Sequence, residues 1–430
     1  MNSNDIKRAI EYARKNGIKE MYYAAKERLE EKKSTHYVFE GASSEELDRQ
    51  RNDNFSGPKI SILVPAFETK QSFMEQLIRS VLAQTYDNFE LIIADASISS
   101  IVEETVQKCI LEAGESGKKI KYVKLPENKG ISINSNEGLK YCSGEYVALL
   151  DHDDIIEPDA LYLMAKSAVD NSYPALIYTD EDKCDENGGG FNTPNYKEDF
   201  NLDLFLTNNY ICHFTMVKGE IIRNLEFRDE YDGAQDYDLF LRVIRTSGEG
   251  IVHVPKVLYH WRCHNDSTSE NPSSKKYAYQ AGLMAVRDFY KEMGIKAIVS
   301  HGKHLGFYDT SYDYLFEDRK DIGAVGGPIF ERGITSGGAM GEDGKLLYGE
   351  LPERYSGYMN RASLSQNVSA LDIRNIKVRQ ELSEIYYRYL DELVSDGADA
   401  RLVSLALSEE IRGKGYLLLY DPKMTAAKKG

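Results

Sequence analysis

Short apolar runs alternate with amphipathic stretches from Lys59 to about residue 150. The runs are rich in Ile, Val and Leu, as buried strands are, and the stretches between them place apolar residues at helical spacing. This alternation predicts strands at residues 60–64, 89–94, 120–125 and 146–150, and helices at residues 73–84, 102–111 and 131–140. Alternating elements of these lengths form an α/β fold, in which a mostly parallel central sheet carries helices on both faces.

The pattern differs on either side of this region. Residues 5–33 combine apolar positions at near-helical spacing with many lysines and arginines, which predicts one or two amphipathic helices. Such an arm either packs on the following domain or lies on an anionic membrane surface. Residues 43–58 are polar and typical of a linker. Further along the chain, we expect a helix at residues 237–244 and a strand at residues 251–254.

One predicted strand ends in a cluster of acids. The apolar residues 146–150 run directly into Asp151, His152, Asp153 and Asp154. Open α/β sheets bind ligands at the carboxyl ends of their strands, and carboxylates there suit Mg²⁺ or Mn²⁺ carrying a diphosphate. A solvated acidic turn is the alternative. If the chain stays extended, His152 faces away from its acidic neighbours.

The Asp-x-Asp spacing alone does not identify this cluster, because it recurs at Asp180 with Asp182 and at Asp236 with Asp238. Only the first pair follows a purely apolar stretch. The turn after the first strand, Pro65 to Glu68, lacks a glycine-rich loop that could cradle phosphate. A cation would therefore have to neutralise the phosphates of a ligand.

Charge and composition exclude several classes of function. The net charge of -16 and the pI near 5.1 argue against a nucleic-acid partner, which needs a basic face. The five cysteines have no metal-site spacing and fit reduced thiols. We find no signal-peptide core and no run of about 18 apolar residues, so we expect a cytoplasmic protein.

Six motifs in order along the chain resemble the family 2 glycosyltransferases, which are inverting enzymes of GT-A fold. The resemblance is to members that build bacterial surface polysaccharides and covers about residues 59–270. Its motifs are Ser61-Ile-Leu-Val-Pro-Ala-Phe67, Ser80-Val-Leu-Ala-Gln-Thr-Tyr86, Asn128-Lys-Gly-Ile-Ser132, Gly144-Glu-Tyr-Val-Ala-Leu-Leu-Asp-His-Asp-Asp154, Gly233-Ala-Gln-Asp-Tyr-Asp-Leu-Phe-Leu-Arg242 and Leu258-Tyr-His-Trp-Arg262. The ordered set makes chance similarity improbable.

The resemblance implies a donor site with a divalent cation. Asp153 and Asp151 would hold Mn²⁺ or Mg²⁺ together with His264, or with His260 as the second choice. Asp95 would accept a hydrogen bond from a uracil or thymine base, with a helix N-cap role as the alternative. The other residues expected to contact the donor nucleotide are Pro65, Ala66, Phe67, Glu68, Asn128, Gly130, Asp151, His152 and Arg262. Ala94 and Ser135 depart from the family pattern, since Asp and Arg are common there.

The resemblance also implies roles for residues on the acceptor side of the site. Asp236 matches the base that removes a proton from the acceptor hydroxyl, and Asp238 is its nearest rival. A first-turn acid of a helix is the alternative role for Asp236. Trp261 would either stack under a sugar ring or pack in the core. Residues 178–182 and 208–213 match segments that flank the acceptor in relatives, although Asp180 and Asp182 could equally form a surface turn.

We therefore predict three regions: a helical arm and linker at 1–57, a transferase domain at 58–300 and a smaller α/β unit at 321–430. The last resembles the acceptor half of a degenerate second transferase, with Ser404 and Ala406 where acids would stand. It would serve acceptor binding, self-association or membrane docking.

The expected activity is transfer of a sugar from a UDP- or dTDP-sugar to a saccharide or lipid-linked saccharide, at the inner face of the plasma membrane. A non-catalytic glycan-binding or scaffolding subunit is the alternative.

Overall fold

The computed structural model describes residues 3–34, 36–247, 250–264, 276–395 and 398–427. The chain divides into two compact units, which are described separately. The large unit comprises residues 36–200 and 209–289. The small unit comprises residues 1–35, 201–208 and 290–430. The chain thus leaves the large unit for eight residues and returns to it.

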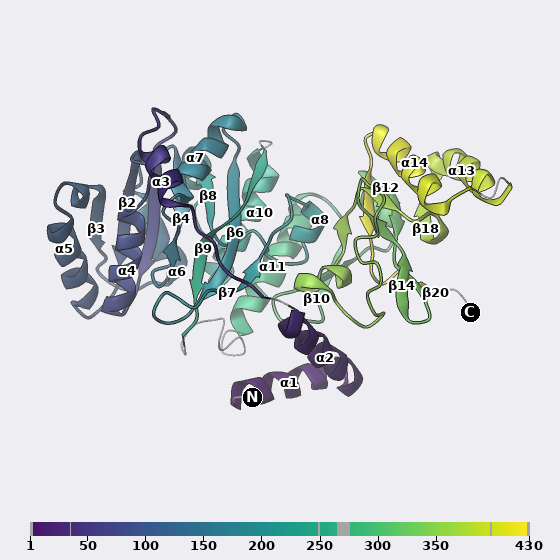
Figure 1. Ribbon diagram of the computed structural model, residues 1–430, viewed down its shortest axis with the longest axis horizontal. Helices are drawn as coiled ribbons and strands as arrows, with labels where there is room; N and C mark the ends of the chain where they lie inside the picture. The colour runs from purple at the N-terminus through teal and green to yellow at the C-terminus, as the bar shows by residue number, and fades with distance from the viewer. Residues whose placement is uncertain (1–2, 35, 248–249, 265–275, 396–397, 428–430) are drawn as a thin grey trace. The chain divides into compact units, whose positions relative to one another are not determined.

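A single sheet forms the centre of the large unit, with strand order β3-β2-β1-β4-β8-β6-β9-β5 and β7 paired to β6 (Figure 1). The strands are β1 (Ile60–Ala66), β2 (Phe89–Asp95), β3 (Ile120–Lys124), β4 (Tyr146–Leu149), β5 (Ile155–Ile156), β6 (Leu176–Cys184), β7 (Asn192–Asn195), β8 (Thr215–Lys218) and β9 (Ile251–Arg262).

The predicted α/β class is confirmed, and all seven elements expected between residues 60 and 150 are present. Strands β1 to β4 are parallel, as expected. The other half of the sheet is mixed, because β8 runs antiparallel to both β4 and β6. The chain reaches β8 from β6 through residues 185–214, which contain β7 and the four-residue helix α8 (Leu202–Phe205) but no long helix of the kind that usually connects parallel neighbours.

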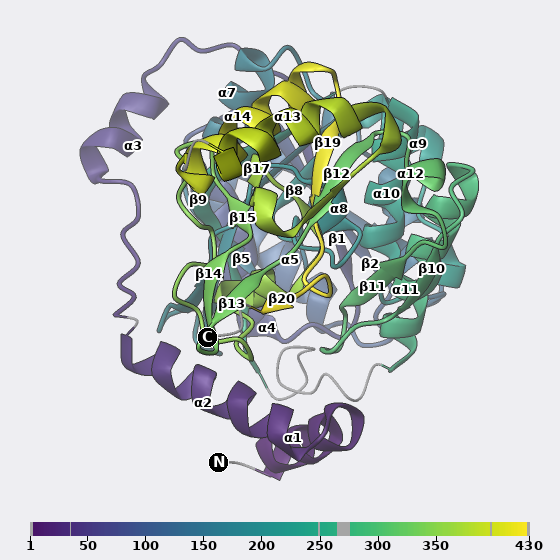
Figure 2. The same ribbon diagram turned by 90° about the vertical axis from the view of Figure 1, so that its right-hand side faces the viewer.

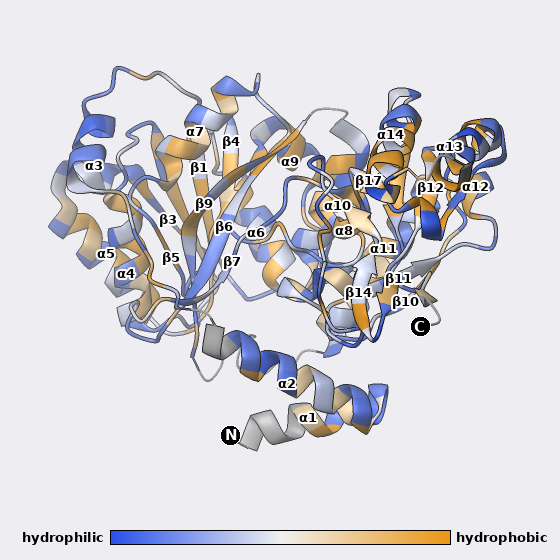
Figure 3. Ribbon diagram, turned by 45° about the vertical axis from the view of Figure 1, so that its right-hand side comes forward, coloured by the Kyte–Doolittle hydropathy of each residue, from blue (hydrophilic) through white to orange (hydrophobic). Residues whose placement is uncertain are grey.

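Helices cover both faces of this sheet. On one face α4 (Gln71–Leu82), α5 (Ile101–Ala113) and α7 (Ala160–Asp170) share a continuous core with the strands. On the other lie α6 (Ile131–Leu139), α9 (Gly219–Leu225), α10 (Gln235–Ser247) and the η2 turn (Asp229–Tyr231). In Figure 3 the central strands β1 and β4 are orange, as buried strands should be, whereas β6 is largely blue. A polar strand in the middle of the sheet needs partners for its charges.

The segment expected to be a linker contains a helix, α3 (Ser44–Arg51), so that prediction is wrong for these residues. The Ser43 side chain caps the helix by accepting a hydrogen bond from the backbone N–H of Glu46, at 3.2 Å. Ser followed three residues later by Glu is a capping signature. The buried Gln50 then accepts a hydrogen bond from Thr85 at 2.7 Å and fixes the helix to the sheet domain.

The small unit brings the N-terminal arm, α1 (Ser3–Asn16) and α2 (Ile18–Ser34), together with the C-terminal residues. Glu20 pairs with Lys303 at 2.8 Å. Glu27 accepts hydrogen bonds from the backbone N–H groups of Ser356 and Gly357. We expected the arm either to pack on the following domain or to lie on an anionic membrane surface. Its two acids contact residues of the C-terminal part, more than 280 residues away in sequence, and the membrane alternative stays a prediction.

The rest of the small unit is built on short strands. They are β10 (Ile298–His301), β11 (Tyr308–Ser311), β12 (Ile322–Gly326), β13 (Ile329–Glu331), β14 (Ile334–Gly337), β15 (Ala339–Met340), β16 (Gln366–Asn367), β17 (Ala370–Leu371), β18 (Ile376–Val378), β19 (Leu417–Tyr420) and β20 (Ala426–Ala427). Helices α13 (Ser383–Ser395) and α14 (Ala400–Gly413) lie side by side (Figures 1 and 2), and α14 packs on the sheet β16-β19-β12-β18. The small unit also contains two short helices, α8 (Leu202–Phe205) and α12 (Leu315–Asp318). Helix α11 (Lys276–Glu292) begins in the large unit and ends in the small unit.

Within the small unit, Ser404 has a structural role. Its side chain is fully buried and accepts a hydrogen bond from the backbone N–H of Ile373 at 2.9 Å. The resemblance of residues 321–430 to half of a transferase stays a prediction. Among the described residues, none of the helices combines the length and the apolarity that crossing a bilayer requires.

Candidate functional site

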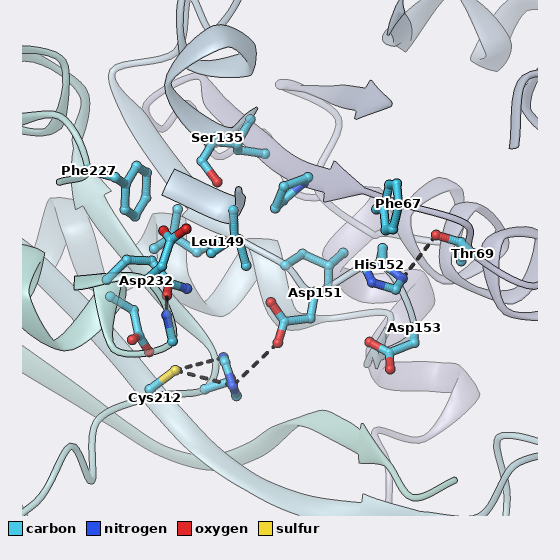
Figure 4. A pocket seen from close by; sticks show the side chains of 18 of the residues that line it. Phe67, Thr69, Ser135, Leu149, Asp151, His152, Asp153, Cys212, Phe227 and Asp232 are labelled. Carbon is cyan, nitrogen blue, oxygen red and sulfur yellow. Dashed lines mark hydrogen bonds and ion pairs between the residues drawn. The ribbon is translucent and has the colours of Figure 1, made fainter. Parts of the chain in front are cut away.

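A cavity of about 860 Å³ opens in the large unit at the carboxyl ends of β1 and β4. Open α/β sheets bind their ligands at the carboxyl ends of the parallel strands. Polar and aromatic side chains line it together (Figure 4). The lining comprises Leu63, Pro65, Phe67, Glu68, Thr69, Lys70, Phe73, Gly130, Ile131, Ser135, Leu149, Leu150, Asp151, His152, Asp153, Cys212, His213, Thr215, Phe227, Asp232, Gly233, Gln235, Asp236, Phe240, Trp261, His264 and Tyr277.

The acid cluster lies at the floor of this cavity. The chain turns at Asp151, whose backbone carbonyl accepts a hydrogen bond from Asp154 N–H at 3.2 Å. Because the chain is no longer extended there, His152 lines the cavity beside Asp151 and Asp153 and does not face away from them, as Figure 4 shows. The Nδ1 atom of His152 lies 3.0 Å from the Thr69 hydroxyl, which fixes the imidazole ring.

Asp153 and His264 meet across the cavity floor, with Oδ2 and Nε2 separated by 2.8 Å. Burial alone would raise the pKa of Asp153. The neighbouring His152 and the hydrogen bond to His264 outweigh burial and lower this pKa below its ordinary value. Asp153 is therefore ionised at neutral pH and available to bind a cation.

Asp151 points toward a different histidine. Its Oδ2 lies 3.7 Å from Nε2 of His213, whose ring stacks on Tyr259. Desolvation at the cavity floor raises the pKa of Asp151, and the charge of Asp153 adds to the rise. A positive charge in the cavity would favour the ionised form of both carboxylates.

Asp154 and Arg262 lie beneath the cavity. Asp154 is fully buried and accepts hydrogen bonds from the Tyr259 hydroxyl and from the Arg262 backbone N–H, the latter at 2.7 Å. The Arg262 guanidinium is also buried, and it donates to the backbone carbonyls of Asp153 and Glu186. These bonds tie β9 to the acid cluster and hold the backbone that carries Asp153.

The structure separates the two acids at the start of α10. Asp236 lines the cavity, whereas Asp238 is buried beneath the helix. Arg242 donates to Asp238 at 2.9 Å, and Arg228 donates to it from a second element. Asp238 therefore has a structural role, and Asp236 is the acid that can reach a ligand.

Asp236 is oriented by its neighbours. Asn209 donates from Nδ2 to Oδ2 of Asp236 at 3.0 Å, and Tyr237 N–H donates to Oδ1 at 2.8 Å. Cys212 lines the same wall, with its sulfur 2.8 Å from Nδ1 of His213. Burial raises the pKa of the Cys212 thiol, as does the nearby Asp236, so this thiol stays protonated.

The start of α6 forms another wall. Gly130 has a φ of +95°, and a Cβ at this position would lie 2.3 Å from Oδ2 of Asp232. Asp232 accepts a hydrogen bond from Ser132 N–H at 3.1 Å. The positive φ favours glycine at this position, and any side chain there would displace the carboxylate of Asp232.

Residues 61–225 match the family model described as Glycosyl transferase family 2. This part of the chain is a family 2 glycosyltransferase domain. Similar curated proteins include the uncharacterized protein y4gI of Sinorhizobium fredii, 36% identical over 58% of this chain and 27% of the relative. The O-antigen biosynthesis protein RfbC of Myxococcus xanthus is 29% identical over 56% of this chain and 19% of its own length.

The chondroitin synthase of Escherichia coli is 28% identical over 49% of this chain and 30% of that protein. The chain thus spans less than a third of the length of each of these three relatives. Among solved structures, Staphylococcus aureus TarS aligns with a TM-score of 0.41 and 19% identity, over 54% of this chain and 65% of that one.

The transferase domain brings most of the expected site residues to one cavity. Those that line it are Pro65, Phe67, Glu68, Gly130, Asp151, His152, Asp153, Asp236, Trp261 and His264. Ala66, Asp95, Asn128 and Arg262 are not among the lining residues. Ala66 is buried in β1, and the side chain of Asn128 accepts hydrogen bonds from Gly130 N–H and Asn134.

Asp95 is the clearest departure from expectation. It is fully buried at the end of β2, where its carboxylate accepts hydrogen bonds from Ser97 N–H, Tyr122 and Lys124 at 2.7 to 3.0 Å. Lys124 stands directly opposite Asp95 in the pairing of β2 with β3. In this arrangement Asp95 neutralises a lysine and offers no free face to a nucleotide base.

The two candidate histidines also separate. His264 contacts Asp153 in the cavity, whereas His260 is buried between Asp182 at 2.5 Å and Glu157 at 3.0 Å. Asp180 is likewise buried and pairs with His253 at 2.8 Å. The alternative that Asp180 and Asp182 form a surface turn is therefore wrong. These pairs supply the partners that the polar strand β6 requires.

Several lining residues of the transferase domain had no expected role. Cys212 and His213 belong to the segment 208–213, whose match to acceptor-flanking segments was the signal for them. Gln235 lies in the motif Gly233–Arg242, which was its signal, whereas Thr69, Asp232 and Tyr277 line the cavity without one.

Proposed function

We propose that this chain is an inverting glycosyltransferase that moves a sugar from a nucleoside-diphosphate donor to a saccharide acceptor. The observation that carries the proposal is that Asp153 and Asp236 line the same cavity, of about 860 Å³. A cavity of this size accommodates a small ligand. Its two carboxylates come from different segments of the domain and can act on opposite sides of the reacting sugar.

The residues at the cavity floor fit a divalent cation. Ligands at about 2.1 Å on adjacent corners of an octahedral ion lie about 3 Å apart. Oδ2 of Asp153 and Nε2 of His264 are 2.8 Å apart. Within the described part of the chain, no group of three His, Cys, Asp or Glu could hold a metal by itself. Mg²⁺ and Mn²⁺ are often held by one or two carboxylates, with substrate phosphates completing the shell.

When bound there, the ion would offset the negative charge that develops on the departing diphosphate. Asp153 and His264 would hold it, with Asp151 beside them. Asp154 and Arg262 support these residues from below, through the hydrogen bonds to β9 and to the Asp153 carbonyl. His152 and Thr69 line the side of the cavity next to the turn that follows β1.

Asp236 would take the proton of the acceptor hydroxyl as this oxygen attacks the anomeric carbon. Each carboxylate oxygen can accept two hydrogen bonds, so the bonds from Asn209 and Tyr237 leave capacity for the hydroxyl. Attack on the face opposite the departing diphosphate inverts the anomeric configuration. A positioned base of this kind contributes roughly 10²- to 10⁴-fold to the rate.

The donor and acceptor classes are part of the proposal. The names of two relatives refer to O-antigen biosynthesis and chondroitin synthesis, which supports a saccharide or lipid-linked saccharide acceptor in surface polysaccharide assembly. We propose UDP- or dTDP-sugars as donors and the cytoplasmic face of the membrane as the place of action. Because Asp95 is occupied by protein donors, base recognition would fall to residues such as Phe67 and Glu68 at the cavity wall.

A donor panel tests this function. The chain is incubated with UDP-, dTDP- and GDP-sugars and Mn²⁺, with and without chelator, and release of the nucleoside diphosphate is measured. We expect slow release from a uridine or thymidine donor that chelator abolishes. If every donor binds without turnover, even with saccharide acceptors present, the alternative of a glycan-binding subunit replaces the proposal.

A further inference from the structure

The segment Asn201–Asn208 belongs to one unit, while the chain on both sides of it belongs to the other. It belongs to the small unit by its contacts, yet the chain enters it from the large unit at Phe200 and returns there at Asn209. Its helix α8 (Leu202–Phe205) begins at Asn201, whose side chain caps Leu204 N–H at 3.1 Å. The residues that follow it include three of the acceptor side: Asn209, Cys212 and His213.

A buried ion pair fixes this segment within the small unit. Arg319 donates to both carboxylate oxygens of Asp203, at 2.6 and 2.9 Å. The same guanidinium donates to both oxygens of Asp321, at 2.9 and 2.7 Å. Asp203 and Arg319 are each about 95% buried or more. A bidentate pair that is excluded from water has one defined geometry.

Two further contacts hold the ends of the segment. Asn201 exchanges hydrogen bonds with the backbone of Asn367, at 2.8 and 3.0 Å. At the other end, the carbonyl of Thr207 accepts a hydrogen bond from Tyr308 N–H at 2.8 Å. The segment is therefore fixed at its start, in its helix and at its last turn.

The chain allows little slack between this anchor and the site. Only Asn208 lies between Thr207 and Asn209, and a step of two residues spans at most about 7 Å of chain. Asn209 then donates to Oδ2 of Asp236 at 3.0 Å. A shift of the anchored segment must move Asn209, because no loop intervenes to absorb the movement.

We propose that the Asp203–Arg319 pair, by fixing the segment Asn201–Asn208, positions the adjoining Asn209 and through it Asp236. This inference rests on the glycosyl transfer proposed above. Asp203 and Arg319 are positioning residues, since neither lines the cavity. The small unit would then be required for transfer even if it binds no ligand itself.

The test compares Asp203→Asn and Arg319→Lys with Asp372→Asn. Asp372 is a matched control because it is a buried acid of the same unit, paired with Arg374 at 2.6 Å, and has no contact with residues 201–208 in the described structure. The measurements on the full chain are kcat of transfer, affinity for the donor with Mn²⁺, and amide hydrogen exchange over residues 207–213.

We expect kcat of transfer to fall about tenfold or more in both anchor variants, since a misplacement of about 1 Å can cost roughly 10²-fold. Donor affinity should be unchanged, exchange over residues 207–213 should be faster, and Asp372→Asn should behave as wild type. Arg319→Lys keeps a positive charge and should be less impaired than Asp203→Asn. If Asp203→Asn does not fold, Asn209→Ala must show the same loss of kcat at unchanged donor affinity.

The inference is overturned if the wild type transfers sugar and both anchor variants show the same kcat and the same hydrogen exchange as the wild type. The proposed function would still stand in that case. An equal loss in Asp372→Asn would also overturn it, because the effect would then be general destabilisation. Absence of transfer by the wild type with every donor and acceptor would overturn the proposed function first, and this inference with it.

Discussion

Asp236 and Asp238 are two residues apart, and the structure assigns them opposite roles that substitution can separate. Asp236 lines the cavity and accepts a side-chain hydrogen bond from Asn209. The Asp238 side chain is only 2% exposed and receives hydrogen bonds from Arg228 and Arg242. We therefore expect Asp236→Asn to impair transfer and Asp238→Ala to impair stability.

The magnitudes follow from burial. Removing one partner of a buried ion pair costs about 3–5 kcal/mol. The Arg228 side chain is 28% exposed and can regain water, so we expect the lower end, about 3 kcal/mol, for Asp238→Ala. At about 2–4 °C per kcal/mol this lowers Tm by about 10 °C. Asp236→Asn keeps one amide oxygen as an acceptor and should cost about 1 kcal/mol, the typical net value of one hydrogen bond.

The assay measures Tm by circular dichroism and kcat of transfer for both variants. Asp236→Asn should fold as wild type and lose roughly 10²- to 10⁴-fold in kcat. Asp238→Ala should keep substantial kcat at a temperature well below its own Tm. The reasoning is refuted if Asp238→Ala is stable but inactive while Asp236→Asn still transfers sugar.

Three further predictions concern other parts of the large unit. Ser43→Ala removes the N-cap of α3 and should destabilise the protein by about 1 kcal/mol in urea unfolding. Gly130→Ala, at φ +95° and with its Cβ 2.3 Å from Asp232, should lower Tm and weaken donor binding, both measurable by calorimetry. Burial alone would raise the pKa of Glu90, but hydrogen bonds led by that from Lys59 lower it to about 2. This lowered pKa contributes up to about 3 kcal/mol of stability above pH 4.5, which is lost as pH falls toward 2, so Glu90→Gln should flatten the acid limb of a stability–pH profile.

Periodicity predicted the first half of the sheet well because its strands are apolar on both faces and its helices are amphipathic. It predicted the middle strand β6 poorly. Asp180, Glu181 and Asp182 in this strand are buried, and their charges are met by His253, Lys197 and His260. Partners that lie as many as 78 residues away cannot be inferred from local patterning.

The candidate site was predicted where local sequence determines position, as at the strand end that carries Asp151 and Asp153. The site was not predicted where the pairing register of two strands determines which side chains meet. Lys124 stands opposite Asp95 and neutralises it, which only the pairing of β2 with β3 reveals. In the same way, Asp232 lines the cavity beside the start of α6, where it accepts a hydrogen bond from Ser132 N–H, a residue 100 positions away in sequence.

The most direct test of the account is metal-dependent donor binding measured by isothermal titration calorimetry. Wild type and Asp153→Ala are titrated with the active sugar nucleotide in the presence of Mn²⁺ and again in the presence of chelator. We predict that the wild type binds the donor only with Mn²⁺ and that Asp153→Ala loses this binding while keeping its Tm. Equal donor affinity in the two proteins, or wild-type binding that chelator does not weaken, would contradict the claim that a cation held by Asp153 binds the donor.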